Sequence, residues 1–171
     1  RAVLQHDRVY GRLDDFLSKC VRKYPGRFVA LAQVDEWIGG QPNQLNRLKH
    51  EIHDLGFKGL YFSTGGFFHS NFKFGLNDPS LEPLWKLVAE LSIPIHWYLA
   101  TLKQNPLETY FYELGELVKW AKSHPGIPCV LTHGLNNVSM DRAGPNRFTP
   151  PEDILTLLKL TDWYIELMLH I

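Results

Sequence analysis

Short apolar segments return along this chain at a nearly constant interval. They begin near residues 28, 59, 94, 128 and 163, so that neighbouring segments start 31 to 35 residues apart. Between them lie segments with apolar residues at helical spacing, such as residues 42–55 and 106–121. A strand and a helix at this period predict an α/β fold with parallel strands, because a parallel neighbour is reached only through a long, right-handed crossover.

Two α/β architectures fit this period. The first is a (β/α)8 TIM barrel, in which about 250 residues use about 31 per unit. The 171 residues would then form a single, incomplete barrel domain (residues 1–171) with roughly strands 2 to 7, and the start without Met and the end inside an apolar run fit a cut chain. The second is an open doubly wound sheet that binds an anion at helix amino ends, which predicts a complete fold within these residues.

The predicted connections differ in length at the two ends of the strands. Links from a helix to the next strand are short, whereas several links from a strand to the next helix are long, at residues 35–41, 64–77 and 135–148. Long loops in a compact domain are usually functional, and barrel active sites lie at the carboxyl ends of the strands. We therefore expect the site on that face.

Two histidines belong to predicted strands near that face. His133 ends the apolar segment 129–132, and we interpret it as a general acid/base or a metal ligand rather than as a residue that only caps the strand. Alternation puts His96 and Tyr98 on one side of their strand. His96 could reach a metal or be a hydrogen-bonded core histidine, and Tyr98 could orient substrate or only fill the mouth.

Two loop residues complete the candidates. His69 lies in an aromatic loop, where it would contact substrate or belong to a lid. Arg142 follows His133 and could hold a carboxylate through two hydrogen bonds, although a surface arginine is the commoner outcome.

The composition narrows the class of partner. Lys+Arg and Asp+Glu are equal, at 18 each, which gives no support for nucleic acid or an anionic membrane. No apolar run approaches the roughly 20 residues that span a bilayer, so we expect no membrane segment. The two cysteines are far apart, which favours reduced thiols and a cytoplasmic protein.

Several short motifs occur together in a familiar order. They are Tyr24-Pro25-Gly26-Arg27-Phe28, Gly56-Phe57-Lys58-Gly59-Leu60, Leu76-Asn77-Asp78-Pro79-Ser80-Leu81 and Val130-Leu131-Thr132-His133-Gly134. Through nearly its whole length the chain resembles the amidohydrolase-related family, the group that contains aminocarboxymuconate semialdehyde decarboxylase.

The resemblance implies a (β/α)8 barrel with one divalent metal, zinc or manganese. Family members decarboxylate unsaturated or aromatic carboxylates without oxidation, or hydrolyse lactones and related bonds, so the implied partner is a small carboxylate or lactone; a homodimer is also implied. In the family a residue pair on the first strand, a histidine on the fifth and an aspartate on the eighth hold the metal. His133 matches the catalytic histidine that ends the sixth strand.

The chain departs from the family pattern in two ways. We expect the first and eighth strands to lie outside this sequence. On the fifth strand the family's histidine stands four residues after the proline, where this chain has Tyr98, whereas His96 stands two residues after Pro94. His96 is therefore the expected ligand if the register is shifted. The alternative is a non-catalytic barrel relative that binds a small molecule or a partner without metal.

Overall fold

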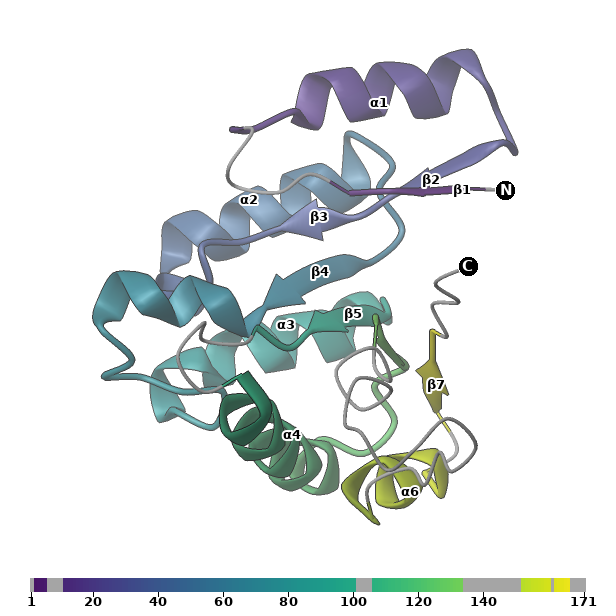
Figure 1. Ribbon diagram of the computed structural model, residues 1–171. Helices are drawn as coiled ribbons and strands as arrows, with labels where there is room; N and C mark the ends of the chain where they lie inside the picture. The colour runs from purple at the N-terminus through teal and green to yellow at the C-terminus, as the bar shows by residue number, and fades with distance from the viewer. Residues whose placement is uncertain (1, 6–10, 101–105, 134–151, 161, 167–171) are drawn as a thin grey trace.

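Strands and helices alternate along the chain in a computed structural model, which describes residues 2–5, 11–100, 106–133, 152–160 and 162–166 (Figure 1). The strands are β1 (Ala2–Leu4), β2 (Phe28–Ala30), β3 (Ala32–Gln33), β4 (Leu60–Ser63), β5 (Ile95–Tyr98), β6 (Cys129–Leu131) and β7 (Trp163–Ile165). The α-helices are α1 (Asp14–Lys23), α2 (Pro42–His53), α3 (Glu82–Leu91), α4 (Pro106–Ser123) and α6 (Glu152–Leu158). Within the described ranges, the 3-10 helices η2 (Glu36–Ile38), η3 (Thr64–Ser70) and η4 (Pro79–Leu81) lie in the connections.

Every strand pair in the described residues is parallel, and the strands follow one another in chain order. β1 pairs with β2, and β3 to β7 form a second sheet in the order β3-β4-β5-β6-β7. A doubly wound sheet would reverse its strand order at a switch point. The sequential order and the helices on the outer side of the curving strands are those of part of a (β/α)8 barrel, as predicted (Figure 1).

One expected strand, residues 27–34, is divided into β2 and β3. Its backbone groups point alternately to opposite sides, so Leu31 donates its N–H to the carbonyl of Leu4 (3.0 Å), whereas Ala32 donates to Gly59 on the other side (2.8 Å). The two sheets are therefore joined through a single extended run that has a neighbour on each side.

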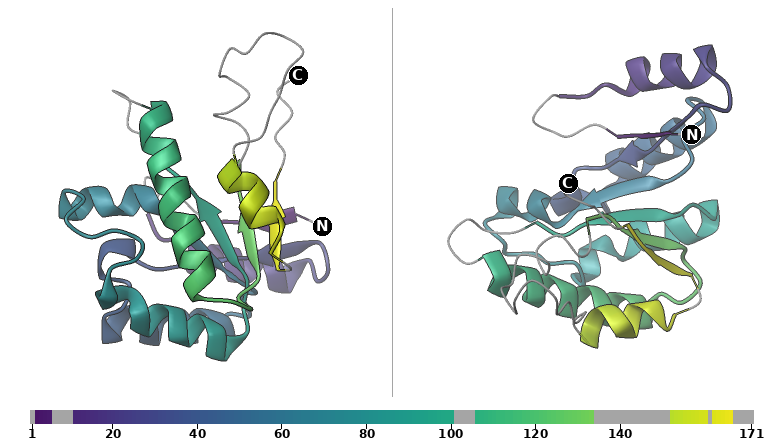
Figure 2. Two further views of the ribbon diagram at one scale, coloured as in Figure 1. Left: turned by 90° about the horizontal axis from the view of Figure 1, so that it is seen from below. Right: turned by 45° about the vertical axis from the view of Figure 1, so that its right-hand side comes forward.

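The helix-covered face of the sheet is packed with aromatic rings. Trp97 on β5 is fully buried, and its ring centroid lies 4.8 Å from that of Trp120 on α4, 5.6 Å from that of Trp85 on α3 and 5.2 Å from that of Phe62 on β4. Trp97 also donates its indole N–H to the Sγ of Cys129 (3.3 Å). Burial raises the pKa of Cys129 to about 12, so this residue is a core thiol, as predicted. Figure 2 shows α4 beside α6, beneath β6 and β7.

Hydrogen bonds tie the carboxyl ends of neighbouring strands together. Ser63 donates its backbone N–H to Oε1 of the buried Glu36 (3.3 Å), which links the loop after β3 to β4. Ala100 donates its N–H to Oγ1 of Thr64 (2.9 Å), which links the loop after β4 to the end of β5. Thr132, after β6, donates its hydroxyl to the carbonyl of Trp97 (2.6 Å), and Glu166, after β7, donates its N–H to Leu131 (3.0 Å). We call this chain of bonds the carboxyl rim.

Asp78 and Gly56 mark the start of one helical segment and the turn after another. Asp78 accepts a hydrogen bond from the N–H of Ser80 (2.9 Å), but the first turn after it is the 3-10 helix η4, and α3 begins at Glu82. α2 ends at His53 with Asp54 as its C-cap, and Gly56 follows with φ 78°, a backbone conformation that favours glycine. Among the described helices none is both long and apolar enough to cross a membrane.

Candidate functional site

The face of the sheet that the helices leave open carries His96 and Tyr98. Because side chains alternate along β5, these two residues point away from Ile95 and Trp97, which are fully buried beneath the helices. The register pairs His96 with Tyr61 on one side and with Val130 on the other, so these side chains share one face. The predicted orientation of His96 and Tyr98 is confirmed, and we call this side the open face.

His133 reaches the open face from the end of β6. The preceding Thr132 is held twice by the carbonyl of Trp97, through its backbone N–H (2.8 Å) and its hydroxyl (2.6 Å). The backbone then turns into the left-handed region at His133, with φ 52°, which a non-glycine residue adopts only at a cost. The imidazole meets the ring of Tyr98 edge to face, with centroids 5.9 Å apart and an interplanar angle of 88°. Two predicted site residues are thus in contact.

Glu166 joins this group, although the sequence analysis did not select it. Its Oε2 lies 3.8 Å from Nδ1 of His133, and its backbone N–H is bonded to Leu131. Alternation along Trp163–Ile165 and the residue after it puts Tyr164 and Glu166 on the same side, and Tyr164 is the register partner of Val130 on the open face. The same alternation that selected Tyr98 could therefore have selected Glu166.

The electrostatics of the group differ between its two imidazoles. Burial lowers the pKa of His96, and the nearby Glu166 carboxylate opposes this shift without cancelling it, so His96 is neutral at pH 7. Nδ1 of His133 is buried and has no hydrogen-bond partner in the part of the chain that the structure describes, although the side chain as a whole is 35% exposed. A neutral imidazole such as that of His96 can accept a proton or bind a metal.

The described residues do not by themselves fit a metal centre. Within the described ranges, no three His, Cys, Asp or Glu side chains gather closely enough to hold an ion. The position that a family histidine would take carries Tyr98, whose side chain is 37% exposed and packs ring to ring on His133. His96 remains a candidate ligand by its chemistry alone, and no reaction step is derived through a metal.

The two loop candidates are not brought into this group. The ring of His69 stacks on Trp37, with centroids 4.3 Å apart, and meets Phe68 edge to face. This places His69 in an aromatic cluster formed by η2 and η3, and its contact with substrate stays a prediction. Arg142 lies outside the described residues, so its role also stays a prediction.

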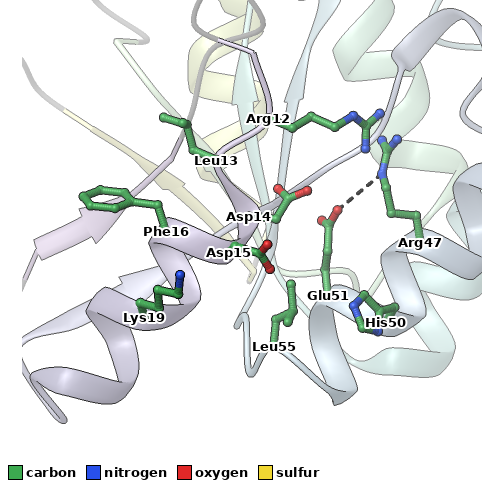
Figure 3. A pocket seen from close by; sticks show the side chains of 10 residues that line it. All are labelled: Arg12, Leu13, Asp14, Asp15, Phe16, Lys19, Arg47, His50, Glu51 and Leu55. Atoms are coloured by element: carbon green, nitrogen blue, oxygen red, sulfur yellow. Dashed lines mark ion pairs between the residues drawn. The ribbon is translucent and has the colours of Figure 1, made fainter.

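A separate cavity of about 440 Å³ lies between α1 and α2 (Figure 3). Its charged groups hold the structure together. Glu51, which is 1% exposed, accepts a hydrogen bond from the backbone N–H of Gln33 (3.0 Å). Arg47 donates to the backbone carbonyl of Gln33 (2.6 Å), and its guanidinium lies 3.3 Å from the carboxylate of Glu51. At the edge of this cavity Arg12 forms an ion pair with Asp35 (3.2 Å). The side chains of α2 thus bond the backbone of Gln33 where β1 no longer pairs with it, which explains the cavity as part of the scaffold.

Comparison with solved structures shows the same fold in larger proteins. An uncharacterised TIM-barrel protein from Bordetella bronchiseptica is 16% identical, with a TM-score of 0.61 over 89% of this chain and 47% of that protein. A 2,6-dihydroxybenzoate decarboxylase from Rhizobium is 18% identical, with a TM-score of 0.57 over 90% of this chain and 56% of its own. A 5-carboxyvanillate decarboxylase variant from Novosphingobium aromaticivorans, with bound manganese and 3-methoxy-4-hydroxy-5-nitrobenzoic acid, is 18% identical, with a TM-score of 0.59 over 92% of this chain and 52% of its own.

The chain spans about half the length of these proteins. The comparison with curated proteins gives no significant match. The family model described as Amidohydrolase matches residues 1–168, which is nearly the whole sequence. The chain, with His133 and Tyr98 in contact at the carboxyl ends of its barrel strands, therefore belongs to the amidohydrolase family.

Proposed function

We propose that this chain is part of an amidohydrolase-type enzyme that removes CO2 from an aromatic or unsaturated carboxylate, or hydrolyses a lactone or a related bond. The observation that carries the proposal is the position of His133, which follows β6, lies against Tyr98 and has a carboxylate beside it on the open face. The bound ligands of two solved relatives, 2,6-dihydroxybenzoate and a substituted nitrobenzoic acid, favour an aromatic carboxylate as substrate.

In this proposal His133 is the general acid/base. Its Nδ1 is buried while the side chain is partly exposed, so Nε2 is the nitrogen available to substrate. In a decarboxylation Nε2 would take up a proton from solvent and deliver it to the carbon that loses CO2, and in a hydrolysis it would accept a proton from water. The hydroxyl of Tyr98 and the guanidinium of Arg142 would orient the carboxylate, and His69 would contact substrate from the loop after β4.

The proposal includes one divalent metal, because two solved relatives were obtained with manganese. Zinc is the other candidate. When bound, such an ion polarises a carboxylate or carbonyl oxygen of the substrate. His96 would be the ligand that this chain contributes, since its pKa is lowered and its imidazole is neutral. The proposed partner is a small molecule and not a nucleic acid. We also propose that the protein is a cytoplasmic homodimer.

Turnover by the purified full-length protein, supplied with manganese or zinc, tests the function. CO2 release from 2,6-dihydroxybenzoate and 5-carboxyvanillate is measured beside hydrolysis of an aromatic lactone. We expect His133→Asn to lower kcat by about 10²–10⁴-fold, the usual contribution of a positioned acid/base. His53→Asn, at an exposed position on α2, is the matched control and should leave kcat unchanged. Full activity of His133→Asn would remove His133 from the chemistry.

Elemental analysis tests the metal separately. We expect about one equivalent of manganese or zinc in the parent protein and a loss of metal in His96→Ala, because a single neutral imidazole ligand contributes strongly to such a site. Metal retained in the variant would keep the enzyme but exclude His96 as a ligand.

A second candidate function is a barrel relative that binds a small molecule without catalysis. It is favoured by Tyr98 at the position of the family's histidine. This candidate predicts no metal after supplementation, no turnover, and binding of 2,6-dihydroxybenzoate that a chelator leaves unchanged.

A further inference from the structure

The carboxylate of Glu166 occupies a defined place beside His133. The backbone N–H of Glu166 is bonded to Leu131, two residues before His133, so the two residues are attached to the same short length of β6. On the other side His133 is fixed by Thr132, whose two bonds to Trp97 hold the backbone just before the left-handed turn. Both backbones are therefore fixed, and only side-chain rotation separates Oε2 of Glu166 from Nδ1 of His133.

The imidazole of His133 needs a partner at Nδ1. A buried polar atom without a hydrogen bond destabilises the folded state, and this nitrogen has no bond in the described part of the chain. The contact with Tyr98 is ring to ring, so it sets the plane of the imidazole without satisfying the nitrogen. Glu166 lies 3.8 Å away, and its side chain is 50% exposed and thus has room to rotate by the remaining distance of roughly 1 Å.

We infer that Glu166 is a positioning residue for His133: its carboxylate accepts a hydrogen bond from Nδ1–H and fixes the tautomer that leaves Nε2 unprotonated on the open face. The inference rests on the proposed function, in which Nε2 of His133 moves the proton. A carboxylate bonded to one ring nitrogen selects the tautomer and stabilises the imidazolium that forms when the other nitrogen accepts a proton. Free imidazole side chains exchange between both tautomers, so without this bond part of the protein would present N–H instead of a base.

The tautomer can be measured without turnover. Long-range ¹H–¹⁵N correlation spectra of the uniformly ¹⁵N-labelled full-length protein, taken near pH 8, show which nitrogen of each neutral histidine carries the proton, and His133→Asn assigns the signal. We expect the parent to hold the proton on Nδ1 of His133. Glu166→Ala should give a mixture of tautomers, and Glu166→Gln, whose amide oxygen can still accept a hydrogen bond, should restore the Nδ1–H form.

Glu152→Ala is the matched control, since it removes an exposed glutamate on α6 that is ion-paired with Lys159 (3.7 Å). This variant should leave the His133 signals unchanged. A proton on Nε2 in the parent, or an unchanged tautomer in Glu166→Ala, would overturn the inference.

Kinetics separate the inference from the proposed function. With the substrate that the parent turns over, Glu166→Ala should lower kcat about 10-fold to 100-fold while KM changes less than about twofold, and Glu166→Gln should recover part of the loss. Glu166→Ala with parental kcat overturns the positioning role even if the tautomer changes. A parent without turnover but with an Nδ1–H tautomer that depends on Glu166 would instead refute the proposed function and leave the Glu166–His133 bond established.

Discussion

The two faces of β5 have opposite characters although they are one residue apart. Ile95 and Trp97 are fully buried and belong to an aromatic layer under α3 and α4. His96 is half-buried and Tyr98 is 37% exposed, and both belong to a group that contains His133 and Glu166. The covered face is apolar and packed, whereas the open face is ionisable and accessible. Alternate side chains of this strand therefore serve different purposes: one set packs the core, and the other faces the candidate site.

The helical layer is not entirely apolar. Two carboxylates, Glu51 on α2 and Glu113 on α4, are buried in the helical layer, at 1% and 8% exposure. Glu51 is bonded to the backbone of Gln33 and paired with Arg47, whereas burial and the neighbouring Glu116 raise the pKa of Glu113 to about 7. One buried charge is thus satisfied by the scaffold, and the other is held partly protonated.

The largest effect on stability is expected on the covered face. Trp97→Ala should lower the free energy of unfolding by about 3–5 kcal/mol, because it leaves a cavity among Phe62, Trp85 and Trp120. Denaturant unfolding followed by circular dichroism measures the loss. A cost below about 1 kcal/mol would break the comparison between the faces.

The next largest loss of stability is expected when the buried, paired carboxylate of Glu51 is removed. Glu51→Ala removes the acceptor for Gln33 and leaves Arg47 without its buried partner, which should cost about 3 kcal/mol in the same unfolding assay. The matched variant is Arg12→Ala, which breaks the exposed pair with Asp35 and should cost at most about 1 kcal/mol. Equal losses in the two variants would show that α2 does not replace a strand neighbour at Gln33.

The raised pKa of Glu113 should appear as a pH dependence of stability. The folded pKa of Glu113, about 7, lies above the ordinary value of 4.5, so the unfolded chain releases this proton first as the pH rises. The contribution of Glu113 to stability should therefore fall between pH 4.5 and 7, by up to about 3 kcal/mol, and stay constant above pH 7. Unfolding free energies of the parent and of Glu113→Gln at pH 5 and pH 8 measure it, since all other groups cancel in the difference. A variant that loses as much stability as the parent would contradict the burial of this carboxyl.

The smallest effect on stability is expected on the open face. Tyr98→Ala should cost less than about 1 kcal/mol, because the side chain is partly exposed and contacts His133 mainly through one ring edge. The same unfolding assay, run beside Trp97→Ala, sharpens the comparison. A loss as large as that of Trp97→Ala would mean that the open face is packed as tightly as the covered one.

The sequence predicted what depends on local periodicity. The repeat of apolar segments predicted the parallel strands and helices, and alternation predicted which side of β5 His96 and Tyr98 occupy. Alternation along the last strand could have put Glu166 on the open face, but its position beside His133 depends on the pairing of β6 with β7, across more than 30 residues of chain. The buried role of Glu51 was missed because a charged residue on a helix is normally solvated, and only the limited length of the β1–β2 pairing brings the backbone of Gln33 to it.

The 3-10 segments were also beyond the sequence analysis. The loop after β4 was expected as an irregular connection, but Ser63 accepts a hydrogen bond from the N–H of Gly65 and starts η3. Gly66 then packs against the side chain of Glu36, where a Cβ atom would collide with the carboxylate. Such a contact between two loops follows from the fold and not from either segment alone.

Trp97 contributes to the packed core through its side chain and to the carboxyl rim through its backbone. Its indole lies in the aromatic layer, whereas its carbonyl oxygen is the acceptor of both bonds that hold Thr132 directly before His133. Any substitution that shifts the indole would also shift the strand that presents the imidazole. A mutational screen scored by turnover alone would therefore rank Trp97 among the catalytic positions, although its side chain faces the helices. Only a screen that measures abundance and turnover in parallel would separate it from His133.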